Sequence, residues 1–268
     1  MPDLPKVTQI ERVDLRGPER IMENIQAIVL AGGKGTRLNC NDCPKAMLPI
    51  AGKPMVDYSL ENLKKAGFAK PVIVVGFHAQ KIKEHLGNKV IYAYQREQLG
   101  TADAVKSAEP KISKDIKNVL SIYGDDSAFY KPETIKNFVN DHLEKQPAIT
   151  LLTVEKDNPT GLGRIIRNQD GFVVEIVEEK LATDEQKKIK EINTGCCVFR
   201  TDFLWPALKK VKKNPVGEYY LTDLIEIARN EHQKVNAYKI DASEWIGINT
   251  AEDLKAAEEA MKKKNQYG

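Results

Sequence analysis

Short apolar runs alternate with amphipathic stretches along most of this 268-residue chain. From Gln26 onward, runs typical of buried parallel strands are followed by segments in which apolar residues recur at helical spacing. The predicted strands are 27–31, 71–76, 89–94 and 118–123, and the predicted helices between them are 55–66, 79–86 and 101–108. This alternation predicts parallel βαβ units and an α/β fold with a doubly wound, mostly parallel, Rossmann-like sheet.

The second half of the chain has a more mixed pattern. Two alternating segments flank Asp170-Gly171 and predict a β-hairpin with strands 164–168 and 172–178. Further strands are predicted at 196–200 and 235–240, and helices at 220–229 and 251–264. Because no glycine- or proline-rich linker interrupts the pattern, 25–268 is expected to be a single domain. Residues 1–24 are polar and without period, which predicts an N-terminal tail.

Charge and composition exclude several classes of partner. The 41 Lys and Arg residues against 38 Asp and Glu leave a net charge of only +3, so no global field favours nucleic acid. No apolar run approaches the roughly 20 residues that span a bilayer, and the first residues lack a secretory signal pattern. A cytoplasmic enzyme with no nucleic-acid or membrane partner is therefore expected.

The most informative segment follows the first predicted strand. That strand ends at Gly32-Gly33, and Gly35 comes one residue later. Glycines at these positions let the backbone turn sharply and present N–H groups at close range to an anion. Three basic side chains follow, Lys34, Arg37 and Lys45. The combination predicts a polyphosphate ligand at the carboxyl end of the strand.

Several motifs compete for this glycine loop. A dinucleotide fingerprint would need glycine where Leu38 stands, and no frame gives the P-loop pattern. An ordinary strand-to-helix turn is the plainest alternative. The segment Leu-Ala-Gly-Gly-Lys-Gly-Thr-Arg-Leu at 30–38, followed by Pro44-Lys45, resembles the sugar-phosphate nucleotidyltransferase family. Within that resemblance, Arg37 and Lys45 are catalytic cations, and the strand end and loop bind the nucleotide through Leu30, Ala31, Gly32, Gly33 and Gly35.

Three further segments narrow the resemblance. They are Gln-Arg-Glu-Gln-Leu-Gly-Thr at 95–101, Gly-Leu-Gly-Arg-Ile-Ile at 161–166 with 176–195, and Gly-Glu-Tyr-Tyr-Leu-Thr-Asp at 217–223. Together they resemble the uridyltransferase domain of bifunctional N-acetylglucosamine-1-phosphate uridyltransferase/glucosamine-1-phosphate acetyltransferase enzymes, collinearly over 26–254. The resemblance implies a nucleotide-binding half at 25–130 and a sugar-binding half at 131–268. It also implies that Gln95, Gly100 and Thr101 read the uracil.

Two residues are candidate ligands of Mg²⁺. Asp125 follows the strand 118–123 across Gly124, where a carboxylate can hold this hard ion against phosphate oxygens. Its neighbour Asp126 should point elsewhere, and both acids could instead cap a helix that starts near Pro132. The resemblance implies that Asp125 and Asn249 are the two metal ligands. A helix cap is the alternative role for Asn249 and the expected role of Thr250.

The sugar site is implied by the resemblance alone. It assigns the N-acetylhexosamine to Tyr123, Gly163, Glu178, Asn193 and Thr194, with a buried carboxylate and amide aimed at the hydroxyls. Taken alone, Glu178 and Asn193 would instead be surface positions of the hairpin.

The implied reaction joins UTP to an N-acetylhexosamine-1-phosphate with Mg²⁺ as cofactor. Other substrates stay possible, namely glucose-1-phosphate, N-acetylgalactosamine-1-phosphate or dTTP. A catalytically silent domain is a further alternative, and the sequence does not predict the oligomeric state.

Some features depart from the family pattern. Its uridyltransferases commonly read Leu-Ala-Ala-Gly where this chain has Ala31-Gly32-Gly33, and Asp125 is followed by Asp-Ser instead of Val-Pro. No hexapeptide repeat of a left-handed β-helix is present, so acetyltransfer is not predicted. Cys40 and Cys43 have the spacing of half a zinc knuckle, but reduced thiols are the favoured interpretation. Cys196 and Cys197 should point to opposite faces of a strand.

Overall fold

One large sheet organises the chain. The structure, a computed structural model, describes residues 24–38 and 42–267, so the predicted tail lies almost wholly outside the described part. Within these residues nine strands form a sheet in the order β11-β7-β10-β6-β1-β4-β5, with β8 pairing to β10 and β9 pairing to β8. The strands are β1 (Ile25–Leu30), β4 (Val72–Val75), β5 (Ile91–Tyr94), β6 (Asn118–Tyr123), β7 (Ile149–Glu155), β8 (Arg164–Arg167), β9 (Val173–Val177), β10 (Glu191–Arg200) and β11 (Val235–Ile240).

The sheet combines four parallel and four antiparallel strand pairs. β6, β1, β4 and β5 all run in one direction, and β7 and β11 are parallel to each other. β10 is antiparallel to both β6 and β7, and the β8–β9 hairpin joins through it. A separate two-stranded hairpin consists of β2 (Pro49–Ile50) and β3 (Lys53–Pro54). The predicted α/β class, with a largely parallel central part of the sheet and a mixed β portion, is confirmed.

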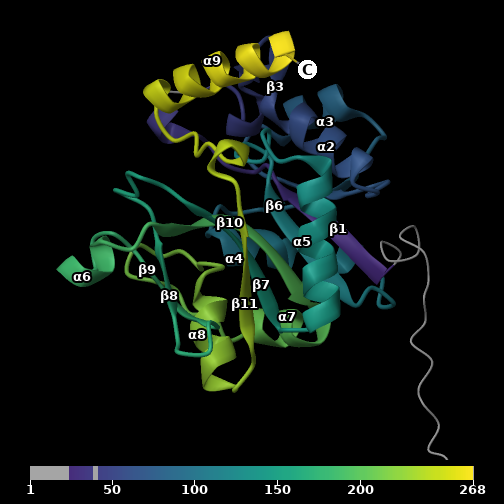
Figure 1. Cartoon of the computed structure of the whole chain (residues 1–268). Coiled ribbons are helices and arrows are strands. Elements are labelled where there is room, and N and C mark those ends of the chain that lie inside the picture. Colours follow the sequence, from purple (N-terminus) through teal and green to yellow (C-terminus); the bar gives the residue numbers. More distant parts are fainter. Residues whose placement is uncertain (1–23, 39–41, 268) are drawn as a thin grey trace, which may run out of the picture.

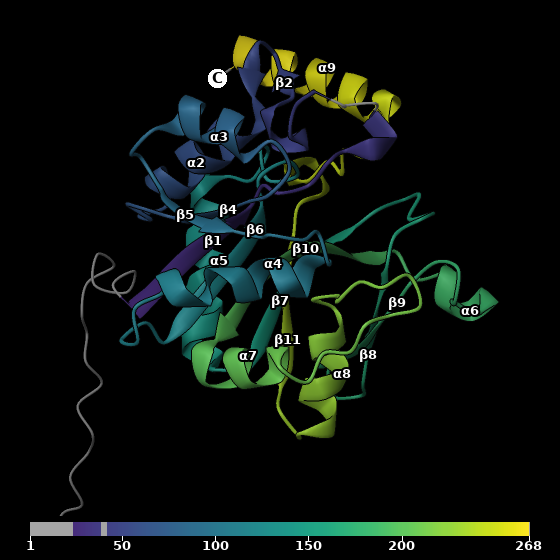
Figure 2. The ribbon, with the colours of Figure 1, turned by 180° about the vertical axis from the view of Figure 1, so that it is seen from behind.

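Helices cover both faces of the sheet (Figures 1 and 2). They are α2 (Met55–Lys65), α3 (Ala79–Leu86), α4 (Thr101–Ala108), α5 (Pro132–Lys145), α6 (Asp184–Lys187), α7 (Thr201–Leu208), α8 (Asp223–Asn230) and α9 (Ala251–Tyr267). Short 3₁₀ turns lie at η2 (Thr36–Leu38), η3 (Lys45–Met47), η4 (Glu109–Lys111) and η5 (Ala242–Glu244). Figure 1 shows α5 on the front of the sheet, and Figure 2 shows α4, α7 and α8 on the opposite side. None of the helices within the described ranges has the length and apolar character required to cross a bilayer.

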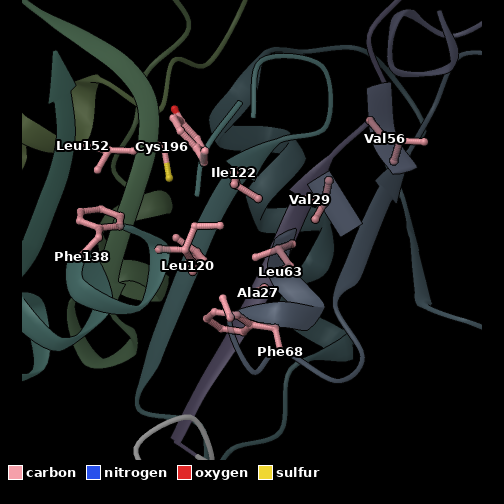
Figure 3. Close-up of a cluster of buried hydrophobic side chains, with 14 of the residues drawn as sticks. Ala27, Val29, Val56, Leu63, Phe68, Leu120, Ile122, Phe138, Leu152 and Cys196 are labelled. Atoms are coloured by element: carbon pink, nitrogen blue, oxygen red, sulfur yellow. The ribbon is translucent and has the colours of Figure 1, made fainter. Parts of the chain in front are cut away.

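Alternation along the strands divides the core into two layers. On one face Ala27 and Val29 pack with Val56 and Leu63 of α2 (Figure 3). On the other face Ile28 and Leu30 pack with the buried sides of α4, α7 and α8. Cys196 belongs to the first layer and Cys197 to the second, so the two thiols point to opposite faces of β10 as predicted. Cys40 lies outside the described residues.

The predicted elements agree with the structure most closely in the first half. The helices predicted at 79–86 and 101–108 and the strands at 118–123 and 235–240 are confirmed with the same bounds. The helix predicted at 220–229 begins only at Asp223. Because β1, β4 and β6 are parallel, their carboxyl ends meet at one edge of the sheet, and the glycine loop and Asp125 both follow there.

Candidate active site

The glycine loop and Lys45 lie directly against each other. Gly35 adopts a φ of 63°, a left-handed conformation, and a Cβ there would lie 3.1 Å from the Cβ of Lys45. The Lys45 amide donates a hydrogen bond to the Gly33 carbonyl at 3.3 Å. Glycine at position 35 is therefore needed both for the backbone angle and for the approach of Lys45. The backbone of Arg37 lies in η2, but its side chain is outside the described part, so its predicted role stays a prediction.

Two carboxylates face the Lys45 ammonium from the end of β6. Gly124 donates its amide to the Leu30 carbonyl at 3.0 Å, which fixes the turn against β1. Lys45 Nζ then lies 2.6 Å from Asp125 Oδ2 and 3.6 Å from Asp126 Oδ1. Burial by itself would lower the pKa of Lys45, but Asp125 and Asp126 outweigh it and raise the pKa above its ordinary value. Lys45 is therefore a charged donor at neutral pH.

The expectation that Asp126 points away from this site is wrong. Residues 124–126 form a turn, so consecutive side chains do not alternate as they would in a strand. The Asp126 carboxylate instead accepts a hydrogen bond from the Ile248 amide at 3.2 Å. Burial raises its pKa to about 7, and the charge of Asp125 acts in the same direction. Neither acid caps α5, whose N-terminal Lys131 amide donates to Glu244.

The bond between Ile248 and Asp126 brings the two predicted metal-ligand segments together. Asn249 follows Ile248, and Asp125 precedes Asp126. Thr250 caps α9 as predicted, because its hydroxyl accepts from the Asp253 amide at 3.1 Å. Since Thr250 fills the cap, the half-buried Asn249 side chain is not required for it.

The residues at this edge fit a divalent cation by their donor chemistry. Asp125 and Asp126 supply two carboxylates against the single charge of Lys45, so this largely buried cluster is net negative when both acids are ionised. Carboxylate and amide oxygens are the ligands that a hard ion such as Mg²⁺ prefers. Among the described residues no group of three or more His, Cys, Asp or Glu side chains is suited to a metal. Mg²⁺ is usually held by one or two carboxylates together with substrate phosphates and waters.

The loop predicted to read the base is braced by the 217–223 segment. Gln95 is nearly buried, and its side-chain amide donates to the Gly100 carbonyl at 2.9 Å and to Asp103 at 3.0 Å. Gly100 has a φ of 98°, and a Cβ there would lie 2.5 Å from the Tyr219 carbonyl. The Thr101 hydroxyl accepts from the Leu221 amide at 2.9 Å. Glycine is therefore required at position 100, and the loop is fixed before any ligand binds.

These groups line one cavity of about 270 Å³. Its walls include ten predicted residues: Leu30, Ala31, Gly32, Gly33, Lys45, Gln95, Gly100, Thr101, Tyr123 and Asp125. The sequence reasoning did not single out two polar residues of the same wall, Gln98 and Glu218. Both lie inside motifs that were recognised, so motif membership was the available signal. Gln98 donates to the Gly32 carbonyl at 2.6 Å and so holds the glycine loop.

Tyr123 separates this cavity from a smaller one. It lines both, and the second cavity is also lined by Asn193 and Gly195. Gly195 has a φ of 82°, and a Cβ there would lie 2.2 Å from the Tyr123 ring. The Asn193 side chain accepts from the Gly195 amide at 3.0 Å. Burial raises the pKa of the Tyr123 phenol, so it stays protonated.

The remaining residues predicted to bind the sugar differ in burial and in orientation. Gly163 accepts from the Asn193 amide at 3.1 Å, and a Cβ on it would lie 3.4 Å from Glu178 Oε1. The expectation of a buried carboxylate at Glu178 is wrong, because this residue follows the edge strand β9 and is exposed. Thr194 alternates with Asn193 along β10, so its buried hydroxyl donates to the Leu152 carbonyl at 2.8 Å. Its side chain does not line either cavity described above.

An α/β sheet with a glycine loop, a lysine and paired carboxylates at its carboxyl edge defines a class of phosphate-binding enzymes. The family model of the nucleotidyl transferases matches residues 26–264, and the chain belongs to this family. The resemblance inferred from the motifs is thereby confirmed at the level of the family.

Three curated relatives of the chain carry the name Bifunctional protein GlmU. The relative from Exiguobacterium sibiricum is 43% identical over 240 residues, covering 89% of this chain and 53% of the relative. The relative from Enterococcus faecalis is 42% identical over 242 residues, covering 90% and 52%. The one from Bacillus subtilis is 39% identical over 245 residues, covering 91% and 53%. The chain thus spans about half the length of the curated relatives that it matches.

Proposed function

We propose that the chain is a sugar-1-phosphate nucleotidyltransferase that makes UDP-N-acetylglucosamine and pyrophosphate from UTP and N-acetylglucosamine-1-phosphate. The observation that carries the proposal is the single cavity in which the glycine loop, Lys45, Asp125 and the Gln95 loop converge. Membership of the nucleotidyl transferase family supports the reaction class, and the likeness to GlmU proteins supports the substrates. A cytoplasmic location belongs to the same proposal.

In this proposal the protein acts by positioning and by charge stabilisation. The sugar phosphate is already an anion at neutral pH, so its oxygen attacks the α-phosphorus of UTP without a general base. The new P–O bond forms in line with the bond between the α-phosphorus and the leaving pyrophosphate. That second bond breaks, and the pyrophosphate keeps its electron pair. Loop N–H groups and Arg37 hold the β- and γ-phosphates, and the Lys45 ammonium holds the attacking and α-phosphates.

Asp125 and Asn249 would hold Mg²⁺, which when bound supplies positive charge beside the phosphates. Family members generally act with a divalent metal ion, and Mg²⁺ in particular is the proposal. The two carboxylates that face the one Lys45 ammonium support a cation at this place.

The two halves of the domain divide substrate recognition between them. In the first, 25–130, the proposed uracil contacts are Gln95, Gly100 and Thr101. In the second, 131–268, Gly163, Glu178, Asn193 and the Thr194 backbone are proposed to bind the N-acetylhexosamine, together with Tyr123 from the end of β6. Asn193 and Tyr123 both line the smaller cavity, which supports the assignment of the sugar to the second half of the domain.

Two alternatives remain to be tested against this proposal. The same cavity suits another sugar-1-phosphate, such as glucose- or N-acetylgalactosamine-1-phosphate, or dTTP in place of UTP. A catalytically silent domain on the same fold is the other alternative, and the presence of both Lys45 and Asp125 in the cavity argues against it.

The test is a substrate panel. Purified protein is incubated with UTP or dTTP, each of the three sugar-1-phosphates, and Mg²⁺, and products are identified by mass. We expect UDP-N-acetylglucosamine to form fastest, and the variant Asp125→Asn to serve as the inactive control. A different nucleotide-sugar as the main product would select the first alternative, and no product from any pair would select the silent domain.

A further inference from the structure

Asp126 lies next to Asp125 and contacts both Lys45 and the backbone before Asn249. Its carboxylate lies 3.6 Å from Lys45 Nζ and accepts a hydrogen bond from the Ile248 amide. Asp125, the preceding residue in the same turn, pairs with the same ammonium at 2.6 Å. Resting on the proposed function, we propose that Asp126 is a positioning residue: it holds Lys45 and the Ile248–Asn249 backbone beside Asp125, and so strengthens divalent-cation binding at that carboxylate.

The first support is the way Asp126 ties down the chain that carries Asn249. Ile248 is fully buried in the apolar cluster beneath α9, which fixes its side chain. Its amide is fixed by Asp126, which lies 122 positions earlier in the chain. Because Ile248 is held at both ends, the next residue, Asn249, has little freedom relative to Asp125. A ligand pair that is fixed before the cation arrives binds it with less loss of entropy.

The second support is the charge around Lys45. Within the described residues two carboxylates lie within 4 Å of its ammonium, and both are largely shielded from water, with side-chain exposures of 13% and 17%. A cation on Asp125 competes with Lys45 for that carboxylate. Asp126 is then the second carboxylate available to Lys45, which keeps the ammonium charge compensated. Without Asp126, cation and lysine would share a single negative group, and like charges would repel.

The closing experiment measures cation affinity directly. Mn²⁺, which has a paramagnetic resonance signal when free, is titrated into wild-type protein and into Asp126→Asn with the metal as the only ligand. Asparagine keeps an oxygen for the Ile248 amide but removes the charge, so we expect Mn²⁺ to bind about tenfold more weakly. Asp126→Ser, a shorter uncharged variant, should weaken binding at least as much. Thermal unfolding of each variant checks that it is folded.

The matched control is Asp141→Asn. Asp141 of α5 pairs with Lys145 at 2.6 Å and accepts from the Asn236 side-chain amide at 2.8 Å, and its side chain is 17% exposed, as is that of Asp126. It lines neither cavity, so we expect this variant to keep the wild-type Mn²⁺ affinity. Unchanged affinity in both Asp126 variants, or an equal loss in Asp141→Asn, would overturn the role of Asp126. Neither outcome touches the proposed function, which is judged separately by nucleotide-sugar formation in the wild-type protein.

Discussion

Lys45 and Asp125 are the residues through which the proposed chemistry acts most directly. Their 2.6 Å ion pair at the cavity wall places a cation and a metal-binding carboxylate together where phosphates would lie. We expect Lys45→Ala and Asp125→Ala each to lower kcat by on the order of 10²-fold, the scale for losing a contact made in the transition state. Pyrophosphate release measures this. Lys53→Ala, which removes a lysine paired with Glu61, is the control. Turnover near that of the wild type in both site variants would contradict the mechanism.

Gly32 lies beside Gln95 at the end of the cavity where the base is proposed to bind. A Cβ added there would lie 3.2 Å from the Gly76 amide nitrogen and 3.4 Å from Gln95 Oε1. The approach to Gly76 is tight and the one to Gln95 is an ordinary contact, so Gly32→Ala must move slightly away from Gly76 and places a methyl group beside the proposed uracil reader. We expect the ratio of kcat/KM for UTP to that for dTTP to change by about 1 kcal/mol, or several-fold.

The neighbouring glycine provides the comparison for that change. A Cβ at Gly33 would meet nothing within 4 Å, so Gly33→Ala alters the same loop without contacting Gln95. Gly33→Ala can change kcat/KM for both nucleotides, but it should leave the ratio of the UTP value to the dTTP value unchanged. Equal UTP-to-dTTP ratios in Gly32→Ala and wild type would show that Gln95 does not respond to position 32.

At the scale of elements, an ion pair between a buried arginine and a partly exposed glutamate holds the β8–β9 hairpin. Arg164, only 1% exposed, donates to Glu179 Oε2 at 2.5 Å and to the Leu162 carbonyl. Glu179→Gln leaves the arginine charge buried without its partner, so we expect a loss of about 3 kcal/mol in the free energy of unfolding. Because Gly163 directly precedes β8 and Glu178 directly follows β9, KM for the sugar phosphate should rise more than KM for UTP.

Urea unfolding and the two KM values test this role of the hairpin. Glu175→Gln is the matched control, since Glu175 is an exposed residue of β9. Wild-type stability in Glu179→Gln would show that the pair contributes nothing. A loss of stability with both KM values unchanged would show that the ion pair contributes to folding and not to binding of the sugar phosphate.

The elements that the sequence predicted well are those with a clear period. α3 and α4 are amphipathic and end where the pattern ends, and β6 is an apolar run between polar segments. β7 was not predicted, because its buried residues include Thr150 and Thr153 and follow neither the alternation of a half-buried strand nor a helical period. α7 was missed as well, and it contains Pro206, which is rare inside helices.

The site was predictable only as far as local geometry follows from neighbours in sequence. The strand-end rule placed Asp125 at the cavity, but Asp126 depends on a turn and on a partner 122 positions away. Alternation along β10 sends the Thr194 side chain into the core while Asn193 lines a cavity, a distinction that motif matching does not make. The exposure of Glu178 follows from β9 lying at the edge of the hairpin, which is tertiary information.

At the scale of the whole molecule, hydrogen bonds connect helices and strands that are far apart in the sequence. The β2–β3 turn donates the Ala51 amide to Glu258 of α9 at 2.7 Å, which fastens the C-terminal helix over the glycine-loop side. His142 of α5 makes a comparable link, with Thr150 of β7 at 2.8 Å and Asn118 of β6 at 3.2 Å. These links make the stability of the domain depend on groups far from the cavity.

The buried His142 makes global stability depend on pH. Burial lowers its pKa to about 4, and the charge of Arg200 acts in the same direction while Asp141 opposes it. Between the ordinary histidine value of about 6.5 and 4, the unfolded chain therefore binds a proton that the folded protein excludes. The contribution is fully present above pH 6.5 and is lost as pH falls toward 4, by about 3 kcal/mol at most.

Urea unfolding between pH 7.5 and about 4.5 measures that slope in wild type and in His142→Gln. Glutamine does not titrate, so we expect the variant to be less stable at pH 7.5 but to lose less stability on acidification. Carboxylates that titrate in the same range contribute equally to both proteins, so the difference between the slopes isolates His142. His232→Gln, at an exposed histidine, should retain the wild-type slope. Parallel curves for wild type and His142→Gln would mean that the His142 network is not responsible for the acid sensitivity.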